Sequence, residues 1–428
     1  MKKYFLLIFI LLLVEVNNGF AQTTLKDDSD PVVSEAKIGT TYTFQKKNIH
    51  GQWKLNVNLP KGYAGSTDKY PVVYVLHGNF YFNFAVGDLQ RLADSGEMPK
   101  AIIVGVSNES NAYFSFGTKK SDQFLDFINE EVFPLVESNY RTHQDRTVLG
   151  WHYTSGFIFH ALINKPEMFN NYLPASPYLG GIELSEIKFD GLNQIYNDNP
   201  SLKNSMFFGV MDNERTVKDA ALGLDSLLKL ADPKNLDWQF NILKPDDENV
   251  IEVSVYRLWT TGLNKLYADY KNDELAIADI DTYKAMGGMS FVKNHYVKRA
   301  EKYGGSSQIA GIWSLLRMAT NANDVLVFEE LIAELNGEYQ DLNLNSVLSY
   351  ARFYALNGKY DEAIAMYKNI DKYHPNLISV HDGMGQSYLS LGDKEEAIAT
   401  YQIAIELAKV QSDSRLEELK SKLHTIDN

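Results

Sequence analysis

The sequence predicts an α/β fold, a doubly wound and mostly parallel sheet with helices on both faces, followed by an all-α region of repeats. Two observations in this chain of 428 residues carry the prediction. From about residue 30 to residue 270, apolar strand-like runs alternate with segments of helical period. After residue 305 the pattern is helical throughout and repeats itself.

The first strand of the α/β region is predicted at residues 52–60, where apolar and polar side chains alternate as in a half-buried strand. Residues 70–78 and 100–108 are continuous apolar, β-branched runs, which are typical of central parallel strands. A helical period follows at residues 122–140. Further elements are expected as strands at 147–151, 205–214 and 240–249 and as a helix that starts near 156.

In a sheet of this kind, ligands bind at the carboxyl ends of the strands. Four loops follow those ends, and they begin near residues 77, 151, 212 and 245. We therefore expect any binding or chemistry of the α/β region to lie on these four loops.

The repeats of the all-α region are defined by positions that recur at the same spacing. Four residues of the first unit return in the second: Tyr354, Gly358, Ala363 and Tyr367 as Tyr388, Gly392, Ala397 and Tyr401. The period resembles that of the tetratricopeptide repeat, in which small residues let paired helices approach. We assign residues 306–428 to such repeats, with a degenerate first unit and a final capping helix, and residues 271–305 to a helical connector. A protein partner that binds the repeats is an expectation.

The N-terminus has the features of a secretory signal. Two lysines precede an apolar stretch from Tyr4 to Val14, and small residues follow. This stretch is about half as long as a membrane span requires. We expect residues 1–22 to be removed and the protein to be exported, periplasmic or secreted, without membrane attachment after cleavage. The alternative is an uncleaved anchor.

Composition narrows the range of partners. The chain is 45% hydrophobic and 12% aromatic, as packed globular proteins are, and it has no cysteine for a disulfide or a lipid anchor. Its formal net charge of −14 repels phosphate backbones. We therefore expect no nucleic-acid partner.

Several blocks of the α/β region occur in the order seen in a known family. They are residues 70–82, 98–108, 124–156, 174–181, 209–214 and 262–267. In this order they resemble the putative-esterase family, α/β-hydrolases that include siderophore esterases and the esterase D type. The resemblance covers roughly residues 40–270 and implies an α/β-hydrolase domain over residues 30–270. A fold by itself assigns no activity.

The catalytic positions of that family are not matched here. Its nucleophile elbow reads roughly G-H-S-x-G-G, and in this chain Trp151 and His152 follow Gly150, so that His152 stands at the place of the serine. Thr154 and Ser155 stand where the family has glycines, which leads us to expect a relaxed or altered turn. Ser155 is an alternative, relocated nucleophile, although a serine in the first turn of a helix usually bonds to its own backbone.

The general base is missing as well. In α/β-hydrolases the chain order is serine, acid, histidine, yet no histidine occurs between residues 161 and 294. The family's histidine position falls at Val250 or Ile251. Without an imidazole, a serine hydroxyl has no group to take its proton.

Other parts of the family's site are retained. Glu214 follows a strand and matches an acidic position of the family. Backbone N–H groups of Tyr153 and of Asn79 or Phe80 can form an oxyanion hole, because such donors do not depend on side-chain identity. Aromatic residues, Trp151 among them, cluster on the same loops, although more than half of them can belong to the core.

Two functions therefore remain open. The first is a pseudo-esterase, inactive as a serine esterase, that serves as a binding or scaffold module for a small acyl or aromatic ligand. The second is an active carboxyl-ester hydrolase with a rearranged site. We expect no cofactor and no metal: His152 and the acidic run at residues 246–248 lack the ligand spacing of known metal motifs.

Overall fold

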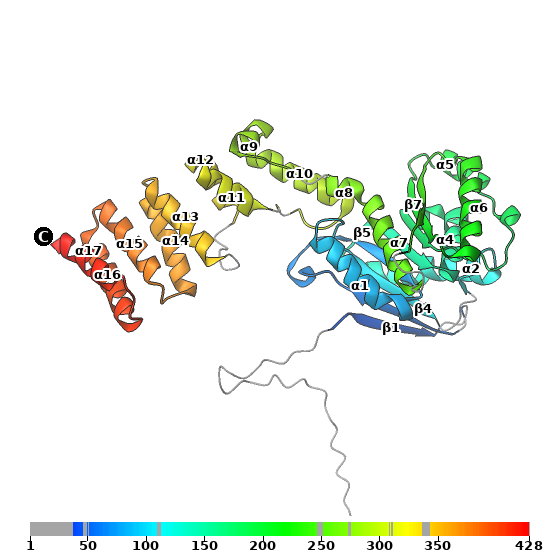
Figure 1. Cartoon of the computed structure of the whole chain (residues 1–428), viewed down its shortest axis with the longest axis horizontal. Helices are drawn as coiled ribbons and strands as arrows, with labels where there is room; N and C mark the ends of the chain where they lie inside the picture. Colours follow the sequence, from blue (N-terminus) through cyan, green and yellow to red (C-terminus); the bar gives the residue numbers. More distant parts are fainter. Residues whose placement is uncertain are drawn as a thin grey trace, which may run out of the picture.

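The computed structural model describes residues 37–427 apart from positions 46–48, 50, 109–112, 246–250, 273–274, 308, 310 and 336–342. The signal expected at residues 1–22 lies outside the described residues. An α/β region is followed by an arm of helices that ends at the C-terminus (Figure 1). Of the helices in the described ranges, none has both the length and the apolar character needed to cross a bilayer.

One mixed sheet forms the centre of the α/β region. Its strands are β1 (Thr40–Gln45), β2 (Gln52–Asn58), β3 (Tyr70–Leu76), β4 (Ile102–Asn108), β5 (Thr142–Trp151), β6 (Asn171–Ala175), β7 (Asn204–Met211) and β8 (Leu236–Leu243). They lie in the order β1-β2-β4-β3-β5-β6-β7-β8. β2 is antiparallel to both of its neighbours, β1 and β4, and the six neighbouring strands from β4 to β8 in this order are parallel to one another. The predicted doubly wound, mostly parallel fold is confirmed.

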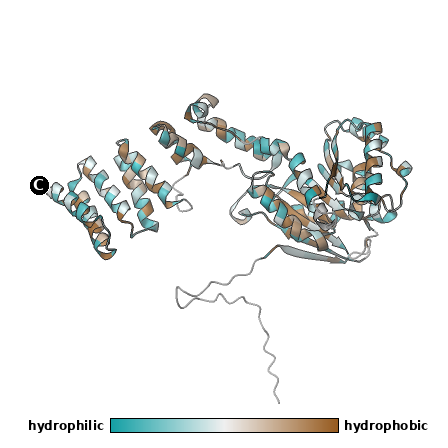
Figure 2. Ribbon diagram, in the orientation of Figure 1, coloured by the Kyte–Doolittle hydropathy of each residue, from teal (hydrophilic) through white to brown (hydrophobic). Residues whose placement is uncertain are grey.

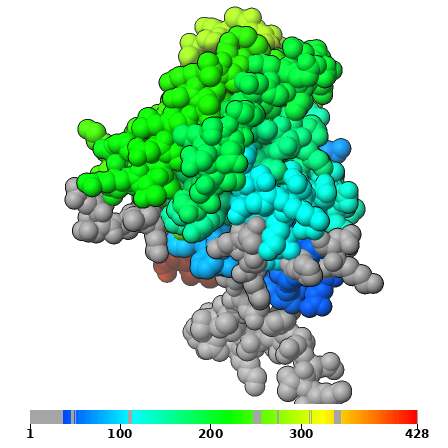
Figure 3. Space-filling model, turned by 90° about the vertical axis from the view of Figure 1, so that its right-hand side faces the viewer, coloured from blue at the N-terminus to red at the C-terminus, as the bar shows by residue number. Residues whose placement is uncertain are grey.

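Helices cover both faces of the sheet. On one face lie α1 (Gly78–Asp94) and α7 (Ile251–Leu266), and on the other lie α2 (Lys119–Phe127), α3 (Phe133–Asn139), α4 (Tyr153–Asn164), α5 (Asp190–Asp198) and α6 (Arg215–Ala231). The helix expected at residues 122–140 is interrupted by a π-helical turn at Ile128–Val132. The short α8 (Ala268–Asn272) follows α7. Seen end-on, the cyan and green segments of this region form one continuous surface (Figure 3).

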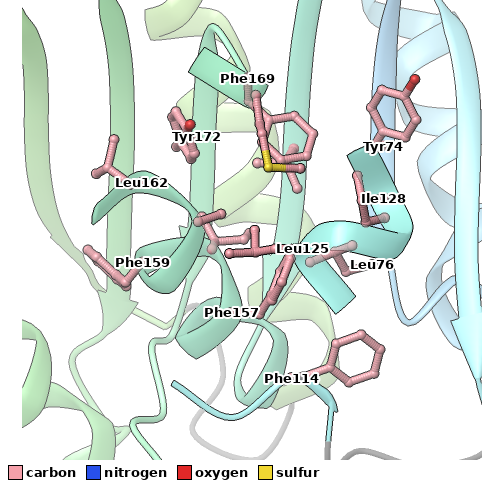
Figure 4. Packing of buried hydrophobic residues seen from close by; sticks show 14 of the residues in the cluster. Tyr74, Leu76, Phe114, Leu125, Ile128, Phe157, Phe159, Leu162, Phe169 and Tyr172 are labelled. Atoms are coloured by element: carbon pink, nitrogen blue, oxygen red, sulfur yellow. The ribbon is translucent and has the colours of Figure 1, made fainter. Parts of the chain in front are cut away.

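Strand β3 shows why the sheet is buried on both faces. Its side chains alternate between two cores: Tyr74 and Leu76 pack with α2 and α4, whereas Val73 and Val75 pack with α1 and α7. All seven residues of the strand are buried. Figure 4 shows the first of these cores, in which aromatic and aliphatic side chains from the sheet and from α4 interdigitate.

The helical arm has a core of its own. Its elements are α9 (Ile280–Met286), α10 (Gly288–Tyr303), α11 (Ile312–Asn321), α12 (Val325–Ala333), α13 (Leu344–Leu356), α14 (Tyr360–Tyr373), α15 (Ile378–Leu391), α16 (Lys394–Val410) and α17 (Leu416–Asp427). One hydrophobic cluster runs from Ile280 to Ile426, and hydrophobic and hydrophilic residues mix along each helix (Figure 2). Ala363 and Ala397 are fully buried, as expected for residues that let helices approach.

The arm contacts the α/β region through the end of α10. The Gly305 N–H donates to the Lys69 carbonyl at 2.6 Å. The His143 Nε2 lies 3.0 Å from the Glu301 carbonyl oxygen. These contacts lie beside the start of β3 and β5, so the joint is at the amino-terminal edge of the sheet, opposite the loops expected to carry function.

Candidate functional site

The site is organised by the turn between β5 and α4. His152 occupies this turn with φ 54° and ψ −111°. A residue with a Cβ rarely adopts such angles, and a sharp, strained strand-to-helix turn is the property of a nucleophile elbow. The relaxed turn that we expected from Thr154 and Ser155 is therefore not what the structure shows.

Hydrogen bonds hold the strained turn from both sides. The His152 N–H donates to the Ala175 carbonyl at 3.0 Å, and the Tyr178 N–H donates to the His152 carbonyl at 3.2 Å. The Thr154 Oγ1 accepts the Trp151 N–H at 2.7 Å and donates to the Trp151 carbonyl at 3.0 Å. The Thr154 side chain was expected to disturb the turn, but its two hydrogen bonds to the Trp151 backbone stabilise it.

Gly150 makes room for this threonine. A Cβ at position 150 would lie 2.7 Å from the Thr154 Oγ1 and 2.7 Å from the Ile158 Cδ1. The glycine that matches the family pattern is therefore required by packing, while the other small residues of the pattern have been replaced.

The His152 ring is held by aromatic contacts. It stacks on the Tyr178 ring with centroids 4.7 Å apart and planes 3° apart, and its edge meets Tyr153 at 4.6 Å. Burial lowers its pKa, and the negative charge of Glu214 acts in the opposite direction. Within the described residues no hydrogen bond to the ring is seen. A neutral imidazole without an orienting partner is poorly suited to act as a nucleophile.

Ser155 lies beneath the elbow. It has no exposed surface, and its hydroxyl donates to the Ala175 carbonyl on β6 at 2.7 Å. The acceptor is a neighbouring strand, whereas we expected the backbone of its own helix. This geometry disfavours Ser155 as a relocated nucleophile, because the hydroxyl is both inaccessible and engaged.

Glu214 fixes the loop that follows β7. Its Oε2 accepts hydrogen bonds from the Ser176 hydroxyl at 2.7 Å and from the Met211 N–H at 2.9 Å. Ser176 is fully buried and has φ 46°, and our sequence reasoning did not identify it. The positions of the expected histidine loop, residues 246–250, lie outside the described residues, and Ile251 begins α7.

The two backbone N–H groups expected to form an oxyanion hole lie at the starts of α1 and α4. Tyr153 begins α4 and Asn79 lies in the first turn of α1, and their N–H groups have no acceptor among the described residues. The Phe80 N–H donates to the His77 carbonyl at 3.0 Å, so Asn79 is the better of the two expected donors. Because β3 and β5 pair directly, both helices begin at the same edge.

Exposed aromatic side chains surround these donors. Phe80 is 61% exposed, Phe84 57% and Tyr153 44%. The indole Nε1 of Trp151 is buried without a hydrogen-bond partner. The aromatic residues expected on these loops are Phe80, Tyr81, Phe82, Phe84, Trp151, Tyr153 and Tyr178. Phe82 is buried, and Tyr81, Trp151 and Tyr178 are half-buried and pack against the hydrophobic cores, so more than half of the set contributes to the core, as expected. Large exposed apolar side chains that gather in one place mark binding surfaces.

His77 is a second histidine at this edge, and sequence reasoning passed over it. It precedes α1 with φ 59°, and its ring contacts Phe80 at 4.5 Å and Phe114 at 6.0 Å. Burial lowers its pKa. Its place at the carboxyl end of a predicted strand was the available signal. Within the described ranges no group of three or more acidic or histidine side chains is placed to hold a metal ion.

These histidines predict how stability depends on pH. Burial lowers the pKa of His77, His152 and His160 in the folded chain. The unfolded chain therefore takes up protons first as the pH falls below about 6.5. The free energy of unfolding is retained above that pH and falls as the pH drops through the folded pKa values.

We expect urea unfolding of His152→Gln to lose less stability between neutral pH and about pH 5 than unfolding of the parent protein. His374→Gln, at an exposed position, is the matched control and should leave the pH dependence unchanged. Equal pH dependence in the parent and in His152→Gln would contradict the assignment.

The fold and the elbow define an α/β-hydrolase-fold protein. Residues 47–232 match the family described as Putative esterase, and residues 379–411 match the tetratricopeptide repeat. One segment of the chain is thus similar to this esterase family and another to the tetratricopeptide repeat, in agreement with the resemblance of the sequence blocks and the repeat spacing.

Two curated proteins of Bacillus subtilis (strain 168) are similar to this chain. The uncharacterized protein YjcH is 28% identical over 155 residues, which are 34% of this chain and 64% of YjcH. The ferri-bacillibactin esterase BesA is 25% identical over 138 residues, 25% of this chain and 47% of BesA. The matched segments span less than two thirds of either relative.

One solved structure is similar over most of the chain. It is an uncharacterised protein from Capnocytophaga ochracea DSM 7271, with a TM-score of 0.51 and 16% identity. The match covers 89% of this chain and 99% of the other. The shared fold therefore extends beyond the α/β region.

Proposed function

We propose that this protein is an exported pseudo-esterase, whose esterase-like domain has lost serine catalysis and serves as a binding or scaffold module. One observation carries the proposal: the elbow is retained in its strained form, but the residue at its tip is His152 in place of serine. The absence of any histidine between residues 161 and 294 supports it, because the serine mechanism depends on an imidazole that follows the acid in the chain.

The retained parts of the site suit a small acyl or aromatic ligand. The N–H groups of Asn79 and Tyr153 can donate to a carbonyl or carboxylate oxygen, as such donors do in an oxyanion hole. The rings of Phe80, Phe84 and Tyr153 are exposed beside them and offer flat apolar faces to a ring or acyl chain. Export is proposed from the first 22 residues, and the repeats are proposed to bind a protein partner.

A second candidate is an active carboxyl-ester hydrolase with a rearranged site. The strained backbone of His152 favours it, because such strain persists where function requires it. The similarity of part of the chain to BesA, which is named an esterase, points the same way. Among the described histidines, His77 and His152 are those that follow strands at the functional edge, so a rearranged mechanism would have to draw its base from them.

Ligand binding is tested by thermal shift with benzoate, which combines a carboxylate and a ring. At a benzoate concentration of about ten times Kd the added stability is about 1.4 kcal/mol, equivalent to a rise in Tm of roughly 2–4 °C. We expect Tyr153→Ala to remove most of this rise. Tyr373→Ala, which changes a tyrosine 45% exposed on α14, should leave it intact. Absence of stabilisation at millimolar benzoate, or an equal rise in both variants, would count against the binding site.

A further inference from the structure

A cavity of 450 Å³ lies at the joint between the α/β region and the helical arm. Four parts of the chain form its wall: the loop before β3, the end of α1 with the connection to β4, α8, and the last turns of α10 with the residues that follow. Side chains that matter for the argument are Lys61, Asp68, Lys100, Tyr270, Tyr296 and Arg299. The cavity is at the amino-terminal edge of the sheet and is separate from the elbow.

Positive charge dominates this wall. Lys61, Lys100 and Arg299 face a single lining carboxylate, Asp68, in a chain whose formal net charge is −14. Lys100 Nζ donates to the Lys61 carbonyl at 3.4 Å. Among the described residues no carboxylate forms an ion pair with any of these three cations. A local excess of positive charge on an acidic protein attracts anions from solution.

Arg299 is the best-placed of the three cations. Its guanidinium lies 3.9 Å above the Tyr270 ring, and one terminal nitrogen donates to the Tyr270 carbonyl at 2.9 Å. The Nε–H of the same guanidinium is buried and has no acceptor. A buried donor without an acceptor destabilises the protein, and a guanidinium is able to bind a carboxylate or phosphate through two of its nitrogens.

The cavity is also large enough to hold a small molecule. A Cβ added at Gly65 or at Gly305 would meet no atom within 4 Å, and both glycines line the cavity. The volume of 450 Å³ falls within the range of small-molecule sites in proteins, about 300–1,000 Å³. Tyr70, Tyr270 and Tyr296 add aromatic rings to the lining, to which small aliphatic side chains also contribute.

We propose that this joint is a binding site for a small organic anion, which presents a carboxylate or phosphate group to Arg299, Lys61 and Lys100. The anion accepts hydrogen bonds from the cationic side chains of the wall and neutralises the local positive charge. Because residues of both the α/β region and the arm line the site, a bound anion adds stability to their docked arrangement. The proposal is independent of any activity at the elbow.

The test is isothermal titration calorimetry of the full chain with two probes, citrate for carboxylates and pyrophosphate for phosphates, at fixed ionic strength. At least one probe should bind with a single site per chain. Arg299→Gln should weaken that binding at least tenfold. Arg317→Gln, the same change at an exposed position on α11, controls for the loss of one positive charge and should bind as the parent does.

Gly65→Leu provides a second variant that leaves the Arg299 contacts untouched. Its backbone does not have a positive φ, so the leucine can be accommodated without strain and is expected to occupy the cavity and abolish binding. Binding of citrate alone assigns the site to carboxylates, and binding of pyrophosphate alone assigns it to phosphates. If neither probe binds at millimolar concentration, or if Arg299→Gln and Gly65→Leu both bind as tightly as Arg317→Gln, the proposal is wrong.

Discussion

Replacing Ala397 by tryptophan is expected to unfold the helical arm at a temperature well below that of the parent protein. Ala397 has no exposed surface and lies on α16 among the buried rings of the arm, Tyr401 included. Forcing extra volume into a packed core costs about 1–3 kcal/mol and sometimes more. Thermal unfolding followed by far-UV circular dichroism will measure the loss.

The control is Ile403→Trp on the same helix, where the parent side chain is 48% exposed and the added volume can extend into solvent. We also expect Ala397→Trp to lower the unfolding midpoint of the α/β region. One core runs through the arm, and its α10 end contacts β3 and β5 at Lys69 and His143. An unchanged α/β midpoint would show that the two parts unfold independently.

The second large effect concerns the strain at the elbow. His152→Gly and His152→Ala both remove the imidazole and its stacking on Tyr178, but only glycine adopts φ 54° and ψ −111° without a steric penalty. We expect the glycine variant to be more stable than the alanine variant by about 1–3 kcal/mol, the usual cost of such a backbone conformation.

Urea unfolding at neutral pH measures this difference directly. Leu230→Gly and Leu230→Ala on α6 form the control pair, because Leu230 is 82% exposed and helical. There the order reverses, since glycine is about 1 kcal/mol less favourable than alanine inside a helix. If alanine were the more stable residue at position 152 as well, the elbow would not be strained.

The sequence was sufficient to predict most of the sheet but not two of its strands. Apolar runs and alternation located β2, β3, β4, β5 and β7, whereas the strand expected at residues 240–249 overlaps β8 only over residues 240–243. Strand β1 carries mostly polar or exposed residues at the edge of the sheet, so it lacks a hydrophobic signal. Strand β6 is only five residues long and contains Pro174, which normally argues against a strand.

The residues of the elbow were predictable from the sequence, but Ser176, His77 and the geometry of the site were not. The presence of His152 at the position of the family's serine can be recognised from the sequence alone. The bridge that Thr154 forms across the turn depends on backbone angles that no local pattern encodes. Ser176 acquires its role only because β6 and β7 are neighbours, which brings its hydroxyl to Glu214.

The joint cavity was not predictable for a similar reason. Lys61, Lys100 and Arg299 are far apart in the chain and come together only when the end of α10 docks beside the start of β3. Each of these residues by itself is an ordinary surface cation, so sequence reasoning had no signal for a shared site.

The central claim, that serine catalysis has been lost, is tested most directly by incubating the purified protein with a fluorophosphonate probe and, in parallel, with short acyl p-nitrophenyl esters. The account predicts no covalent labelling and no hydrolysis above that of the His152→Ala variant. Labelling that disappears in Ser155→Ala would establish a relocated serine nucleophile. Hydrolysis that is lost in His152→Ala would establish a rearranged site, and either result would contradict the account.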